Sequence, residues 1–136
     1  LFQPPVTGFE EDKTWGEING LRYPINNGNL LVKKGRMFKD VILERDENKY
    51  WKWTIFDFEF KTLFFIKKAI GEWEVKKLID NKIEVVYTYT YYSKKKLFNP
   101  LTWLLVNIQI KGIMVRALAG IRKQAESGEE FIYKLN

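Results

Sequence analysis

Three tyrosines spaced two residues apart are the clearest chemical feature of the sequence. Tyr87, Tyr89 and Tyr91 alternate with threonines, so a β-strand would place the three phenols on one face. A buried tyrosine hydroxyl needs a hydrogen-bond partner, which a ligand or a water molecule could be. Two interpretations are open: the phenols line a binding pocket, or they form an aromatic core beneath a helix.

Two tryptophans on earlier segments extend this aromatic set. Trp53 alternates with polar neighbours, and Trp73 lies between Glu72 and Glu74. Alternating aromatic side chains on strands mostly pack against one another, so a core role is favoured over a pocket role for both tryptophans. The two glutamates would share the face opposite Trp73, where solvent exposure is a simpler explanation than a catalytic carboxylate pair.

The sequence contains no cysteine and no histidine. This double absence removes most sets of metal ligands, every thiol nucleophile and every Ser/His or Cys/His relay. A general base would have to be Asp, Glu, Tyr or Lys, and the pattern indicates no buried carboxylate. We therefore expect no metal, no cofactor and no catalytic residue. The lack of cysteine fits a cytoplasmic location.

Short alternating segments joined by polar turns must position these side chains. We expect a hairpin from Leu21 to Val32 around the turn Asn26-Asn27-Gly28, followed by strands at 37–45, 50–58, 62–76 and 83–92. The connections are too short for the crossovers of a parallel sheet. The pattern therefore predicts an antiparallel meander.

A long helix is expected after the last strand. Asn99 followed by Pro100 is typical of a helix start with Asn99 as N-cap, and Gly128 is typical of a residue just beyond a helix end. Residues 101–115 are apolar almost all round, which predicts burial on most sides. Met114 and Leu118 would face a cavity or the core. Polar residues interrupt the run before it reaches the ~20 apolar residues of a membrane span, so no transmembrane segment is expected.

A chain of 136 residues, 46% hydrophobic and 29% charged, has the size and balance of one folded domain. Its net charge is +6, and its lysines occur in short clusters such as Lys94, Lys95 and Lys96. Nucleic acid or an anionic membrane would explain these clusters. Their positions at strand ends and turns instead favour solvated loops and protected sheet edges, so we expect no nucleic-acid partner.

Four phrases resemble a known family: PPVTGFEEDKTWGEINGLRYPINNGN, GEWEV, KIEVVYTYTYY and NPLTWLLVNIQIKGIMVRALAGIRKQAESGE. Together they are similar to the START-like polyketide cyclase/dehydrase superfamily, often called SRPBCC, from Pro4 to Glu129. The resemblance implies a single α+β domain over residues 1–136 with the helix-grip fold, a curved antiparallel sheet wrapped around a long C-terminal helix. The phrases are signatures of a fold and not of catalysis.

Members of that superfamily usually begin with an extra strand and two short helices, which nothing at the start of this sequence resembles. Two explanations are open. Either the sequence in hand lacks those elements, or the domain is a shortened grip whose open sheet edge pairs with a partner chain, as in a homodimer.

The resemblance implies a hydrophobic ligand, such as a lipid, polyketide or isoprenoid, held between sheet and helix. Arg22 would then pair with a carboxylate or enolate of the ligand, or else lie at the surface. A polyketide cyclase or dehydrase activity is the first alternative, and binding to an anionic membrane or to nucleic acid is the second. The expected ligand-binding residues are Arg22, Trp53, Trp73, Tyr87, Tyr89, Tyr91, Met114 and Leu118.

Overall fold

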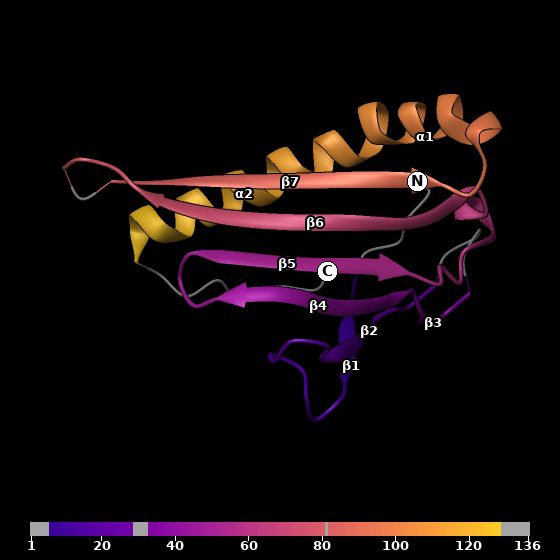
Figure 1. Ribbon diagram of the computed structural model, residues 1–136, viewed down its shortest axis with the longest axis horizontal. Coiled ribbons are helices and arrows are strands. Elements are labelled where there is room, and N and C mark those ends of the chain that lie inside the picture. Colours follow the sequence, from indigo (N-terminus) through magenta and orange to yellow (C-terminus); the bar gives the residue numbers. More distant parts are fainter. Residues whose placement is uncertain (1–5, 29–32, 81, 129–136) are drawn as a thin grey trace.

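The computed structural model describes residues 6–28, 33–80 and 82–128 of the chain. In these residues seven antiparallel strands form one open sheet, and a long C-terminal helix runs obliquely across one face of it (Figure 1). This arrangement confirms the predicted α+β fold of the helix-grip kind. We call the face of the sheet that meets the helix the inner face.

The sheet follows the chain from one edge to the other, which confirms the predicted meander. The strand order is β1-β2-β4-β5-β6-β7, and the short β3 pairs with β2. The second strand of the hairpin expected up to Val32 falls on residues outside the described ranges. The strands are β1 (Gly8–Glu11), β2 (Leu21–Asn26), β3 (Gly35–Arg36), β4 (Lys39–Asp46), β5 (Tyr50–Phe56), β6 (Ile66–Lys77) and β7 (Ile83–Ser93).

Strand register decides which side chains meet on the inner face. Trp51 of β5 pairs with Trp73 of β6, and Trp73 pairs with Tyr87 of β7. Further along the same strands, Ile55 pairs with Ala69. Directly paired residues project to the same face, so one end of the inner face carries a row of large rings and the other end carries aliphatic side chains.

The C-terminal helix is continuous from Lys96 to Ser127. It consists of the 3₁₀ turn η2 (Lys96–Phe98), α1 (Asn99–Leu105), the π-turn η3 (Val106–Ile110) and α2 (Lys111–Ser127). Gly128 ends the helix as predicted, with a left-handed backbone and an N–H that donates to the Gln124 carbonyl at 3.0 Å. The prediction of Asn99 as N-cap is wrong. Asn99 already has helical backbone angles because η2 precedes it, and no side-chain hydrogen bond caps α1.

The π-turn divides the helix into two parts. The N–H of Lys111 donates to the Val106 carbonyl, five residues earlier. The side-chain amide of Asn107 donates to the Trp103 carbonyl at 2.9 Å. One extra residue in the turn shifts the positions that face the sheet. These positions are Thr102, Leu105 and Ile110 up to the end of the turn, and Met114 and Leu118 after it.

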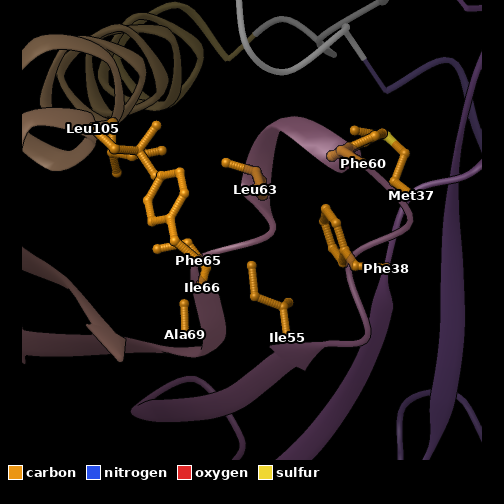
Figure 2. Close-up of a cluster of buried hydrophobic side chains, with 10 residues drawn as sticks. Met37, Phe38, Ile55, Phe60, Leu63, Phe65, Ile66, Ala69 and Leu105 are labelled. Carbon is orange, nitrogen blue, oxygen red and sulfur yellow. The ribbon is translucent and has the colours of Figure 1, made fainter. Parts of the chain in front are cut away.

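The buried core lies at one end of the inner face, beneath α1. Figure 2 shows Leu105 of the helix pointing toward Phe65, while Leu63 comes from the loop that contains η1 (Lys61–Leu63). Side chains from the strands, from the helix and from the η1 loop therefore fill this end of the molecule. The cluster consists of Met37, Phe38, Ile55, Phe60, Leu63, Phe65, Ile66, Ala69, Leu105 and Ile110.

Much of the apolar helix is exposed, so the predicted burial of residues 101–115 on most sides is wrong. Trp103 exposes 65% of its surface and Ile108 exposes 71%. No residue of α2 reaches full burial. The sheet covers one face of the helix, and the described residues supply no second layer on the other face. Contact with the sheet therefore does not account for the apolar residues on the other sides of the helix.

Candidate functional site

An open pocket of about 320 Å³ lies on the inner face, toward the end away from the core. Its walls are Trp15, Arg22, Trp51, Trp53 and Trp73. Four of the five tryptophans in the chain thus surround one cation. Pockets with apolar, aromatic walls and a few convergent polar groups are typical of small-molecule sites. We call this site the tryptophan pocket.

Both the sheet and one loop position the walls of the tryptophan pocket. Trp51, Trp53 and Trp73 project from adjacent strands, β5 and β6. Trp15 comes from the loop between β1 and β2. That loop is fixed to the sheet by the Asn19 N–H, which donates to the Ile42 carbonyl at 2.8 Å. The loop therefore holds Trp15 over the strands rather than leaving the sheet open.

Trp53 lies across Gly71, its partner on β6. A Cβ atom at Gly71 would fall 2.3 Å from Cε2 of Trp53, so only glycine admits the indole in this position. The indole Nε1 of Trp53 then donates to the hydroxyl of Tyr89 at 2.9 Å. The two rings meet edge to face with their centroids 5.7 Å apart. The absence of a side chain at Gly71 thus allows Trp53 to take this orientation in the wall of the tryptophan pocket.

The tyrosines of β7 continue the aromatic surface. Tyr87 lies 5.5 Å from Tyr89, and Tyr89 lies 5.6 Å from Tyr91, between ring centroids. Burial raises the pKa of Tyr87 to about 12, while a hydrogen bond with Tyr89 opposes that shift. Burial also raises the pKa of Tyr89 and of Tyr91. All three phenols are therefore protonated at neutral pH and are able to donate a hydrogen bond.

Arg22 is held by an ion pair and by two aromatic rings. Its Nε donates to Oδ2 of Asp40 at 2.8 Å. The guanidinium carbon lies 4.3 Å from the centroid of the Phe9 ring and 4.0 Å from that of Trp15. A guanidinium carries five N–H donors, and the bond to Asp40 uses one of them. Arg22 can therefore present further donors to a molecule in the tryptophan pocket.

Asp40 is a buried carboxylate, which corrects the prediction that none exists. Only 3% of the residue is exposed, and its Oδ1 has no hydrogen-bond partner among the described residues. Burial raises the pKa of Asp40, opposed by the charge and hydrogen bond of Arg22. The sequence contains a signal for this position, because Asp40 alternates along the chain with Phe38 and Ile42, both buried.

The structure brings together five of the eight expected site residues. Arg22, Trp53 and Trp73 line the tryptophan pocket, and Tyr87 and Tyr89 contact its rings, since Tyr87 lies 5.9 Å from Trp53 and 5.6 Å from Trp73 between centroids.

The other three expected residues lie elsewhere. Tyr91 packs against the core and lines a small gap of about 10 Å³ beside Leu105. Met114 also packs against the core, and Leu118 is half-buried on the sheet side of α2. Neither Met114 nor Leu118 lines the tryptophan pocket.

Two pocket residues were not expected from the sequence. Trp51 shares the alternation that identified Trp53 and was detectable from it. Trp15 lies in a loop, where no periodicity indicates the direction of a side chain. The two glutamates beside Trp73 behave as predicted, because Glu72 accepts a hydrogen bond from the Tyr50 hydroxyl at 2.8 Å on the opposite face of the sheet.

Within the described ranges, no cluster of three or more acidic, histidine or cysteine side chains could hold a metal ion. Comparison of the chain with protein-family models, with curated proteins and with solved structures finds no match in any of the three. The geometry of the tryptophan pocket is therefore the main guide to function.

Proposed function

We propose that this protein binds a hydrophobic small molecule in the tryptophan pocket, on the inner face of the sheet. The observation that carries the proposal is the convergence of Trp15, Trp51, Trp53 and Trp73 around Arg22. The similarity of four sequence phrases to the START-like superfamily supports the same class of ligand, a lipid-like, polyketide-like or isoprenoid molecule.

The chemistry of the walls narrows the ligand. Flat indole faces favour an apolar or planar body, whose burial would contribute about 25 cal/mol for each Å² removed from water. Arg22 and the protonated phenols are donors, so they favour a ligand with a carbonyl or carboxylate acceptor. Asp40 neutralises part of the charge of Arg22, which favours a weakly charged acceptor over a phosphate.

Two fluorescent probes that differ in one group test this proposal. N-phenyl-1-naphthylamine is neutral, and 8-anilino-1-naphthalenesulfonate is the same ring system with an added sulfonate. We expect the neutral probe to bind with an affinity that salt barely changes, because burial and not charge drives its binding. No binding of either probe, or a tenfold loss of neutral-probe affinity at high salt, would contradict the proposal.

A pair of tryptophan variants locates the binding site. Trp73→Ala removes a wall of the tryptophan pocket and is expected to lower the affinity for N-phenyl-1-naphthylamine about tenfold, the effect of losing a well-buried aromatic contact. Trp103→Ala is the matched control, since Trp103 lies on the exposed side of α1, outside the pocket. Equal losses in the two variants would place the probe elsewhere.

A polyketide cyclase or dehydrase activity is a second candidate, and one observation favours it. Asp40 is a buried carboxylate with a raised pKa, and such groups act as general bases in enzymes. Asp40→Asn keeps the shape of the side chain. An enzyme of this kind would lose turnover of a linear poly-β-keto thioester in this variant while it still binds the neutral probe. Equal turnover in parent and variant would exclude Asp40 as the base.

A further inference from the structure

The outward side of α1 carries a strip of exposed apolar side chains. Leu97 exposes 82% of its surface and Ile108 exposes 71%. Positions 97, 101, 104 and 108 are three or four residues apart, so they lie along one side of a helix. We define the apolar strip as Phe64, Leu97, Leu101, Leu104 and Ile108, all of which are exposed.

The apolar strip is a fixed surface rather than a frayed end. Phe64 stacks edge to face against Phe98, at 5.6 Å between centroids, which ties the η1 loop to the start of the helix. The N–H of Lys94 donates to the Phe65 carbonyl at 2.8 Å and joins the same two segments. Between them lies a shallow apolar groove of about 90 Å³, lined in part by Leu101, Leu104 and Ile108.

The sequence around the apolar strip contains cations and no acids. No aspartate or glutamate occurs from residue 85 to residue 125, while seven lysines and arginines do: Lys94, Lys95, Lys96, Lys111, Arg116, Arg122 and Lys123. Between Glu59 and Glu72, again without an acid, η1 adds Lys61 and the start of β6 adds Lys67 and Lys68.

The lysines nearest the apolar strip are free of ion pairs. Lys61, Lys67, Lys94, Lys95 and Lys96 are exposed, and none forms an ion pair within the described part of the chain. Cations on the sheet are different, since Arg36 pairs with Glu10 and Lys39 pairs with Asp57. The charges beside the strip are therefore available to an anionic partner.

We propose that the apolar strip and these lysines dock the protein on the surface of an anionic lipid membrane. Apolar side chains would enter the boundary between headgroups and acyl chains, and the lysines would contact anionic headgroups. Trp103, exposed on the flank of α1, suits the same interface, where tryptophans are enriched. This inference does not rest on the tryptophan pocket, which no residue of the apolar strip lines.

The helix lies on the membrane and does not cross it. By length and composition the segment Lys96–Ser127 is a candidate membrane span. However, Leu105 and Ile110 are buried in the core of the domain. A transmembrane placement would pull both residues out of that core and surround the attached sheet with lipid.

The charges also separate a membrane from two other partners. A second copy of the chain, docked strip to strip, would bring cationic segments together without acids to pair with them, and like charges oppose such contact. Nucleic acid would use the lysines but gain little from an apolar strip with a shallow groove. A surface that combines both features fits an anionic bilayer.

Vesicle sedimentation tests this proposal. The parent protein should sediment with vesicles that mix phosphatidylcholine and phosphatidylglycerol, and at least tenfold more weakly with phosphatidylcholine alone. Leu104→Ser combined with Ile108→Ser should reduce binding to the anionic vesicles at least tenfold. Ile18→Ser is the control, since Ile18 is 58% exposed in the β1–β2 loop, and its binding should equal that of the parent.

A second set of variants keeps the test decisive if the serine variant does not fold. Replacing Lys94, Lys95 and Lys96 by Gln should lower binding roughly fivefold for each lysine. Replacing Lys13, Lys33 and Lys34 by Gln removes the same charge from elsewhere and should change binding little. Equal losses of vesicle binding in the two triple variants would show that only the net charge of the protein matters. That result would contradict a docking surface at the apolar strip.

Other outcomes would also overturn the proposal. Equal sedimentation with neutral and anionic vesicles, or none with either, excludes an anionic membrane. A dimer in analytical ultracentrifugation that the serine variant abolishes assigns the apolar strip to a second copy. Binding to duplex DNA without binding to vesicles assigns the lysines to nucleic acid. In every case the affinity for N-phenyl-1-naphthylamine should stay unchanged, which separates this test from that of the tryptophan pocket.

Discussion

The two ends of the inner face are built on the same strands but packed differently. Under α1, the sheet residues Ile55, Ile66 and Ala69 belong to one buried cluster with Leu105, Phe60 and Phe65. At the other end Trp51 and Trp73 share with Trp15 of the β1–β2 loop a pocket of about 320 Å³, which no residue of the helix lines.

The difference shows that alternation alone does not make a core. Both ends present large apolar side chains to the inner face, but only the α1 end receives side chains from elements on several sides. Branched and small residues interdigitate there, whereas broad rings at the other end leave space between them. One end of the sheet can therefore supply stability while the other stays open to a ligand.

The largest effect is expected from the packed end. Leu105→Ala removes the helix side chain that reaches the core and should lower the free energy of unfolding by about 2 to 5 kcal/mol. Leu101→Ala, one turn earlier on the same helix, is the control, because Leu101 is 39% exposed and its loss should cost far less. Chemical denaturation measures both, and equal losses would mean that the two sides of α1 are packed alike.

Gly71→Ala tests the boundary between the two ends. The new Cβ would overlap the Trp53 indole and break its hydrogen bond to Tyr89, so we expect a loss of about 1 to 3 kcal/mol, as for overpacking. Tryptophan emission should shift at the same time. Gly120→Ala is the matched control, since nothing lies near its Cβ position and alanine should stabilise the helix by up to ~1 kcal/mol. An unchanged stability of Gly71→Ala would show that Trp53 can move freely.

Alkaline pH should lower the free energy of unfolding through Tyr87. The pKa of Tyr87 is raised from 10.0 to about 12, so the unfolded chain releases this proton first. The free energy of unfolding should be unaffected by Tyr87 below pH 10 and should fall as the pH rises toward 12. Denaturation at a series of pH values measures this fall, and Tyr87→Phe should make it shallower. A steeper or identical slope in the variant would contradict the burial of that phenol.

Leu118→Trp should have the smallest effect on stability. In a tightly packed site such enlargement costs about 1 to 3 kcal/mol, but Leu118 is only half-buried on α2. We therefore expect the melting temperature to hold or rise, and the affinity for N-phenyl-1-naphthylamine to stay unchanged because Leu118 does not line the tryptophan pocket. A loss of stability would show that Leu118 is tightly packed, and a loss of probe affinity would place the bound probe beside α2.

The sequence was informative wherever a period of two extended along a strand. It predicted the meander and the shared face of Tyr87, Tyr89 and Tyr91, because every second residue of a strand must lie on one side. It did not indicate which end would be packed, since Phe60 and Leu63 reach the core from a segment without regular alternation. The burial of Asp40 was detectable from its place between Phe38 and Ile42, although no buried carboxylate was predicted.

The helix shows a different limit of sequence reading. Its apolar run predicted burial, yet Trp103, Leu104 and Ile108 are exposed, because hydrophobicity reports an affinity for apolar surroundings and does not say whether protein or lipid supplies them. Asn99 had the residue type of a cap, but the 3₁₀ turn before it moved the helix start. Trp15 had no detectable signal, since its direction depends on a loop fixed by a contact with Ile42.

The π-turn at Val106–Ile110 has a consequence for how the length of this helix can change during evolution. Deleting one residue from a helix rotates everything beyond the deletion by about 100°. Within the π-turn, by contrast, the loss of Asn107 would remove the extra residue of the i→i+5 turn and leave Met114 and Leu118 facing the sheet. The turn thus absorbs a change of one residue without rotating α1 against α2, so insertions and deletions of single residues should concentrate here and not within α1.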